Sequence, residues 1–115
     1  MCSFVGTNKK SVNLEEVNRF SKNRGPDATN VVVHNGFTLV HNLLSITGDF
    51  TTQPIMSKDG SVACLFNGEI YNYKSFGDFS SDGHCILSLY EEIGEQSIKD
   101  LDGEFAIVIL DFKKD

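Results

Sequence analysis

The stretch SVACLFNGEIYNY, residues 61–73, joins an apolar run to a polar segment. Residues 61–66 have the composition of a strand, and an Asn-Gly pair such as Asn67 and Gly68 after an apolar run is typical of a hairpin turn. The residues that follow do not have the pattern of a returning strand, and 70–76 is ambiguous between helix and strand. A second interpretation therefore stays open, in which the Asn67 amide and the Gly68 N–H are donors to an oxyanion.

Other β-prone runs lie on both sides of this stretch. Residues 1–6 begin the chain with a short strand pattern, MCSFVG. Asn35 and Gly36 separate residues 30–34 from residues 37–42 and predict a type I′ hairpin of two antiparallel strands. The run FAIVIL, residues 105–110, is continuously apolar and predicts a strand buried on both faces.

Two helices are predicted between the strands. Asn13 can cap a short helix whose apolar residues between 14 and 20 fall on one face, with Glu16 at its third position. Ser81 or Asp82 can cap a second helix over residues 83–93, whose apolar stripe packs against the core.

Composition narrows the class of protein. The chain has 115 residues and 12.7 kDa, with 40% hydrophobic and 23% charged residues, which is typical of one globular domain. Its net charge of −6 disfavours nucleic acid as a partner. Neither an apolar run long enough to span a bilayer nor a secretory signal is present, so we expect no membrane partner and a cytoplasmic location.

The three cysteines, Cys2, Cys64 and Cys85, lack the spacing of a disulfide framework or of a zinc site, so we expect no metal and no cofactor. His34, His41 and the two later cysteines lie in strand or helix patterns and are interpreted as packing residues.

Cys2 carries the clearest chemical signal. Removal of Met1 would place a thiol and a free α-amine on one residue. The amine titrates near ~7.7 to 8.0 and a thiol near ~8.5, so at neutral pH the amine can accept the thiol proton. The alternative is that a cysteine at this position is only the chance beginning of a strand.

Several motifs resemble, in order, those of the glutaminase domain of asparagine synthetases, which are class II glutamine amidotransferases. The resemblance covers nearly the whole chain. It implies an N-terminal nucleophile hydrolase with an α+β fold, an αββα sandwich of mainly antiparallel sheets. The chain is expected to be a single domain over residues 1–115, shortened relative to the family and without a synthetase domain. The matching segments are MCSFVG, RGPD, HNLLSI, QP, FNGEIYNY and SDGHCILSLYEEIGEQSIKDLDGEFA.

The resemblance also implies roles for single residues. Cys2 corresponds to the nucleophile and general base, and Asn67 with Gly68 to the oxyanion hole. Glu69 and Asp82 correspond to substrate-binding positions, where Asp82 would face the α-ammonium of a glutamine-like substrate. A helix cap is equally compatible with Asp82. Arg24, in the RGPD segment, corresponds to a supporting residue beside the N-terminal strand.

Leu43 departs from the family pattern. It stands where the family has an arginine that binds the α-carboxylate of glutamine, and losing one partner of such a pair costs roughly 2 to 5 kcal/mol. We therefore expect glutamine to bind poorly and an amide without a free α-carboxylate to be the better substrate. A lysine from another loop is the alternative source of charge: Lys9, Lys10, Lys58 or Lys74.

The sequence thus predicts a minimal amidohydrolase that cleaves a carboxamide of a small molecule or peptide and releases ammonia. Two alternatives stay open: a non-catalytic relic or regulatory subunit, and an ammonia-donating subunit of a separate synthetase. Because the family domain continues beyond FKKD, we expect an open sheet edge and a homodimer. A compact viral genome is as compatible with the sequence as a cellular one.

Overall fold

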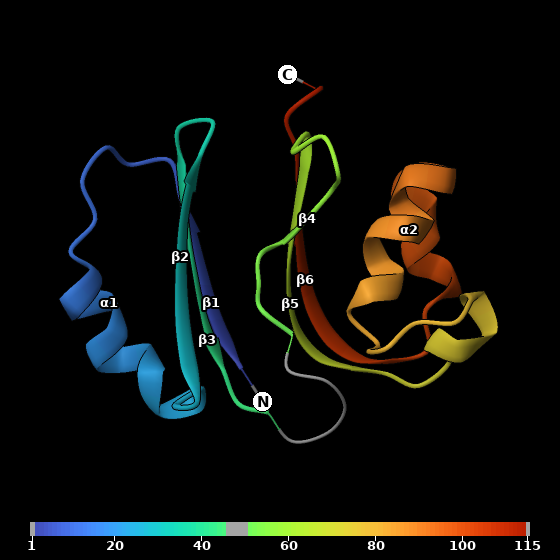
Figure 1. Cartoon of the computed structure of the whole chain (residues 1–115), viewed down its shortest axis with the longest axis horizontal. Coiled ribbons are helices and arrows are strands. Elements are labelled where there is room, and N and C mark those ends of the chain that lie inside the picture. Colours follow the sequence, from blue (N-terminus) through green and yellow to red (C-terminus); the bar gives the residue numbers. More distant parts are fainter. Residues whose placement is uncertain (1, 46–50, 115) are drawn as a thin grey trace.

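A computed structural model describes residues 2–45 and 51–114, so Met1 lies outside the described residues. The elements form four layers: helix α1 (Leu14–Ser21), two antiparallel three-stranded sheets, and helix α2 (His84–Ile93) (Figure 1). This is the αββα sandwich expected from the resemblance. Within the described segments, no helix is long and apolar enough to cross a bilayer.

The first sheet has the strand order β1-β3-β2. It consists of β1 (Ser3–Thr7), β2 (Ala28–His34) and β3 (Phe37–Leu43). Asn35 and Gly36 connect β2 to β3 with φ of 46° and 80°, as the predicted type I′ hairpin requires. Helix α1 begins as predicted, because the Asn13 side chain accepts a hydrogen bond from Glu16 N at 3.2 Å. The 3₁₀ helix η1 (Lys22–Arg24) follows it.

The second sheet has the order β4-β5-β6 and corrects two predictions. It consists of β4 (Ile55–Met56), β5 (Val62–Ile70) and β6 (Gly103–Asp111). β5 continues straight through Asn67 and Gly68, which pair with β6, so the hairpin-turn interpretation of this pair is wrong. β6 lies at the sheet edge with Glu104, Ala106 and Val108 exposed, so the expected burial on both faces is also wrong.

The remaining helical segments follow β5 and precede β6. The ambiguous residues divide between the end of β5 and the 3₁₀ helix η2 (Tyr73–Phe76). Helix α2 has Gly83 at its N-cap without a side-chain cap bond, so the expected cap by Ser81 or Asp82 is wrong. Instead, the carboxylate of Asp82 accepts hydrogen bonds from Ile70 N and Gly83 N, both at 2.9 Å. The 3₁₀ helix η3 (Gly94–Asp100) leads into β6.

Two apolar clusters hold the layers together. The larger one packs α2 against the outer face of β5 and β6, and its buried members are Val62, Cys64, Phe66, Ile70, Cys85, Ile86 and Leu87. The smaller one lies between the sheets, where Leu39 of the first sheet meets Ala63 and Leu65 of the second. At roughly 25 cal/mol per Å² of buried apolar area, these clusters are the main favourable contribution to folding.

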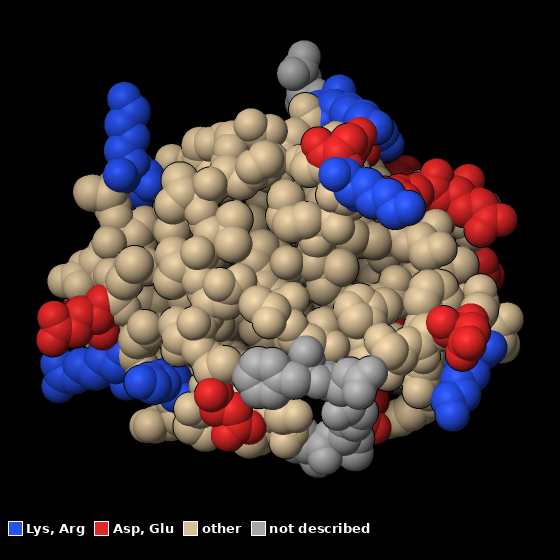
Figure 2. Space-filling view, viewed as in Figure 1, with Lys and Arg blue, Asp and Glu red and all other residues tan. Residues whose placement is uncertain are grey.

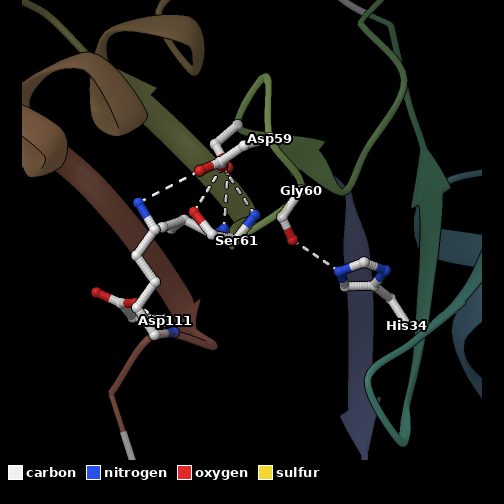
Figure 3. A network of polar contacts seen from close by, with 8 residues as sticks. His34, Asp59, Gly60, Ser61 and Asp111 are labelled. Atoms are coloured by element: carbon white, nitrogen blue, oxygen red, sulfur yellow. Dashed lines mark hydrogen bonds and ion pairs between the residues drawn. The ribbon is translucent and has the colours of Figure 1, made fainter.

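A polar network joins the two sheets at one end of the sandwich (Figure 3). His34, at the end of β2, bonds through Nε2 to the carbonyl oxygen of Gly60 at 2.7 Å, and its ring packs edge-on against Phe112. Because a carbonyl only accepts, Nε2 carries the proton. Asp59 organises the facing turn by accepting bonds from Ser57 and Ser61, and it forms an ion pair with Lys113 at 3.3 Å. We call these contacts the His34 clasp.

Candidate active site

Cys2 lies between the two sheets, just before β1. Its backbone nitrogen donates a hydrogen bond to Asn67 Oδ1 on β5 at 2.8 Å. Its Sγ lies beside the end of β3, where Leu44 N donates to the sulfur at 3.5 Å. A donor aimed at sulfur stabilises negative charge there. The first sheet thus supplies the thiol, and the second sheet fixes the nitrogen of the same residue.

The backbone of β5 presents a row of N–H groups beside Cys2. Antiparallel pairing turns the N–H groups of alternate residues to the same side of a strand. Phe66 N donates to Gln53 Oε1 at 2.7 Å and Ile70 N donates to Asp82 Oδ2 at 2.9 Å, so both groups point away from β6. The Gly68 N–H, between them in this alternation, is therefore directed to the same side. Because its Oδ1 is occupied by Cys2, Asn67 keeps Nδ2 as its donor.

A cavity of about 560 Å³ lies at this place. Six of the seven predicted site residues line it: Cys2, Leu43, Asn67, Gly68, Glu69 and Asp82. Arg24 does not line it. The arrangement therefore brings a thiol, two hydrogen-bond donors and carboxylates around one volume, which suits attack on a neutral carbonyl group whose oxygen becomes negative.

Arg24, the supporting residue expected in the RGPD segment, is exposed at the end of η1. Gly25 is buried, and a side chain there would overlap the backbone carbonyl of Asn42. Asp27 N donates to Leu43 O at 2.9 Å, and Asp27 Oδ2 accepts from Ser45 N at 2.8 Å. These bonds fix the segment that contacts the sulfur of Cys2.

The other cysteines and His41 lie in the interior. Burial raises the pKa of Cys64 to about 12 and that of Cys85 to about 11, so both are protonated thiols at neutral pH. Burial lowers the pKa of His41 to about 4, so its ring is neutral. In the described part of the chain, no three His, Cys, Asp or Glu side chains are grouped so that they could hold a metal ion.

Comparisons with known proteins agree with this geometry. The family model described as a glutamine amidotransferase domain matches residues 1–115. The chain belongs to this family. It is 37% identical over 114 residues to a glutamine-hydrolyzing asparagine synthetase of Triphysaria versicolor, with 89% of this chain and 19% of the relative covered.

Further relatives give the same picture. Asparagine synthetase 2 of Arabidopsis thaliana is 38% identical over 89% of this chain and 19% of its own length. Asparagine synthetase B of Escherichia coli is 33% identical over 100% of this chain and 24% of its own length. The chain thus spans about a fifth to a quarter of the curated relatives that it matches, and the resemblance to class II glutamine amidotransferases is confirmed.

The amidotransferase domain also places residues at the cavity that the sequence did not single out. Glu104 lines it, because β6 pairs Glu104 directly with Glu69. Gln53 lines it as well, and its side chain is buried. Glu104 lies in the DGEFA motif and Gln53 in the QP motif. The order of motifs predicts neither the strand register that places Glu104 nor the hydrogen bonds between the Gln53 side chain and the backbone. Asp27 lies in the RGPD segment, in which only Arg24 was assigned a role from the sequence.

Proposed function

We propose that this amidotransferase domain is an N-terminal cysteine amidohydrolase, which cleaves a carboxamide and releases ammonia. The observation that carries the proposal is the contact of the Cys2 backbone nitrogen with Asn67 Oδ1, beside a sulfur that faces the same cavity. Removal of Met1 converts that nitrogen into an α-amine, which accepts a proton without any histidine at the site. The glutamine-hydrolyzing names of the relatives agree with this activity.

The reaction has two halves. In the first, the α-amine takes the proton of the Cys2 thiol, and Sγ attacks the amide carbon. The resulting ammonium returns its proton to the leaving nitrogen, so that ammonia departs and a thioester remains. In the second, the amine takes a proton from water, hydroxide attacks the thioester, and the released sulfur recovers the proton. The sum is amide plus water giving carboxylic acid plus ammonia.

Charge on the carbonyl oxygen is the main electrostatic demand in both halves. Asn67 Nδ2 and the Gly68 N–H are the proposed donors to this oxygen. Removing one such donor costs about 10²- to 10³-fold in kcat in other hydrolases. The bond from Cys2 to Asn67 Oδ1 gives a further advantage, because it orients the amide so that its NH₂ group is left for the oxyanion.

The experiment compares ammonia release by three forms of the protein. The first is the chain without Met1, verified by mass measurement, and the second is Cys2→Ala. The third carries a short peptide before Cys2, which keeps the thiol but blocks its amine. Activity in the first form alone supports the proposal. Equal ammonia release by the first and third forms would refute the role of the amine, and equal release by all three would refute catalysis by Cys2.

A further inference from the structure

The lining of the active-site cavity is acidic. Glu69, Asp82 and Glu104 are among its lining residues, whereas none of its described lining residues is Lys, Arg or His. The sequence from residue 42 to residue 57 also contains none of these three types. The lysines considered above as an alternative source of charge, Lys9, Lys10, Lys58 and Lys74, do not line the cavity.

The negative field extends to the rim of the cavity. Glu69 and Glu104 face each other across β5 and β6, which places two like charges directly opposite. The pKa of the neighbouring Tyr71 is raised first by the charge of Glu104, then by burial, and then by the charges of Glu69 and Asp102. A group that enters the cavity beside the Glu69 and Glu104 side chains therefore gains by carrying positive charge and loses by carrying negative charge.

An apolar wall lies across from the acidic strands. Leu43 is 8% exposed and lines the cavity together with Leu44. A carboxylate placed against this wall would lose its hydration without gaining an ionic partner, which is costly. A neutral amide group or an aliphatic chain would lose much less.

We infer that the substrate is a carboxamide that carries a free amine and no free carboxylate, such as a glutamine whose α-carboxyl group is already in an amide bond. This inference rests on the proposed function and specifies its substrate class. The amine lies toward Glu69, Asp82 and Glu104, the blocked carboxyl group lies toward Leu43, and the side-chain amide reaches Cys2. An N-terminal glutamine of a peptide meets all three conditions.

Three probes separate these conditions. Glutamine α-N-methylamide has the amine and lacks the carboxylate, glutamine has both, and N-acetylglutamine α-N-methylamide has neither. We expect kcat/KM for ammonia release to be highest for the first probe, and lower by about tenfold or more for each of the others, since tenfold corresponds to 1.4 kcal/mol. Higher ionic strength should reduce the advantage of the cationic probe.

Variants of the cavity test the same assignment. Glu104→Gln should weaken the advantage of the cationic probe over the acetylated one, whereas Glu91→Gln on α2, whose side chain is exposed and outside the cavity, should not. Leu43→Arg should shift the preference toward glutamine by about 30-fold or more. Should that buried substitution prevent folding, the comparison of probes on the unchanged chain still decides.

Separate measurements of binding and of turnover distinguish the inferred substrate class from the proposed amidohydrolase activity. Calorimetric titration of Cys2→Ala with each probe measures recognition alone. Preferential binding of the cationic probe without turnover by the unchanged chain supports the inference and refutes the proposed catalysis. Ammonia release from glutamine at a rate equal to or above that from its N-methylamide overturns the inference and leaves the catalysis standing. Equal rates for the acetylated and cationic probes overturn the role of the acidic residues.

Discussion

Gly68 combines two roles at a single residue. It has a φ of 137°, and a side chain there would overlap the carbonyl oxygen of Glu104 on β6. Because a residue with a Cβ would push the two strands apart, glycine permits both the pairing with β6 and the direction of its own N–H. The close approach of strands at this point therefore belongs to the architecture of the candidate oxyanion site.

Substitution of Gly68 by alanine should test that close approach. Gly36→Ala is a matched control, because Gly36 also has a positive φ of 80° but no atom within 4 Å of the added Cβ. We expect Gly36→Ala to lower the free energy of unfolding by about 1 kcal/mol through backbone strain. Gly68→Ala should lower it by roughly 1 to 3 kcal/mol more, because the clash adds to the strain.

Urea unfolding of both variants measures the difference. Equal losses in the two variants would contradict the clash and leave only the backbone strain. Loss of ammonia release in Gly68→Ala at temperatures where the variant is still folded would further connect the residue to the site.

At the residue scale, sequence reasoning found the cavity but not all of its supports. Cys2, Asn67 and Glu69 were identifiable because motif order carried them, and the structure places them around one volume. Gln53, Asp27 and Glu104 act through backbone hydrogen bonds or strand register, which leave no distinct pattern in a single sequence. Asp82 was expected either to bind substrate or to cap a helix. It does not cap α2; it lines the cavity, and its carboxylate accepts a hydrogen bond from Ile70 N of β5.

At the scale of elements, Gln53 replaces a missing piece of β4. β4 begins only at Ile55, which pairs with Cys64, so the backbone of Phe66 has no strand partner on that side. The Gln53 amide takes the place of a paired residue: it accepts from Phe66 N at 2.7 Å and donates to Phe66 O at 3.0 Å. The backbone carbonyl oxygen of Gln53 accepts a hydrogen bond from Asn30 Nδ2 of β2 at 2.7 Å, which connects this segment to the first sheet. Gln53 thereby fixes β5 immediately before Asn67.

Gln53→Glu should disturb this arrangement with almost no change of shape. The carboxylate can accept from Phe66 N but repels Phe66 O, so we expect a loss of roughly 1 to 3 kcal/mol in the free energy of unfolding at neutral pH. The loss should shrink toward pH 5, because burial favours the protonated carboxyl group, which can donate. Gln96→Glu makes the same chemical change at an exposed position of η3.

Denaturant unfolding of both variants and the unchanged chain at pH 7.5 and pH 5 provides the measurement. A loss in Gln53→Glu that is the same at both pH values would contradict the donor role of the amide. A comparable loss in Gln96→Glu would show that charge alone causes the effect.

The His34 clasp ties the β2–β3 hairpin to the turn between β4 and β5 (Figure 3). His34→Ala removes one hydrogen bond and one ring contact, so we expect a loss of about 1 to 2 kcal/mol in the free energy of unfolding. The control is Val33→Thr, whose site on the same strand is 73% exposed, with an expected change within about 0.5 kcal/mol. Thermal unfolding of the two variants compares them, and equal melting temperatures would argue against the clasp.

Elements determined by neighbouring residues could be predicted from the sequence, whereas those determined by distant strand pairing could not. The Asn13 cap and the Asn35-Gly36 turn are decided by neighbouring residues, and both were predicted. The course of β5 through Asn67 and Gly68 depends on its pairing with β6, which is distant in sequence. The apolar run of β6 indicated a strand correctly, but its place at the sheet edge is set by the order of strands.

At the scale of the whole molecule, the site exists only where the two sheets meet. Cys2 comes from the first sheet and Asn67 from the second, and the His34 clasp joins the sheets at the other end of the sandwich (Figure 1). Charged side chains gather around the rim of the face in Figure 2, with uncharged atoms across its middle. The layer between the sheets is apolar where Leu39 packs against Ala63 and Leu65. The predicted homodimer stays a prediction.

His41 is the polar exception in this layer. It is 1% exposed, and its Nε2 has no hydrogen-bond partner. On β3 it lies on the same face as Leu39, which packs between the sheets, and Leu43, which lines the cavity. Its pKa is lowered to about 4 by burial, so the folded protein keeps it neutral where an unfolded chain would protonate it. Protonation of His41 at low pH would therefore place a charge in the contact between the two sheets.

The sign of the resulting pH dependence follows from proton binding. Between pH 6.5 and about 4 the unfolded chain binds a proton at His41 that the folded protein does not, so the free energy of unfolding falls as the pH falls. The full effect is on the order of 3 kcal/mol. His41→Leu should flatten this slope in urea unfolding at pH 6.5, 5.5 and 4.5, and His84→Gln should retain it. A wild-type slope in His41→Leu would mean that acid loosens the sheets through another group.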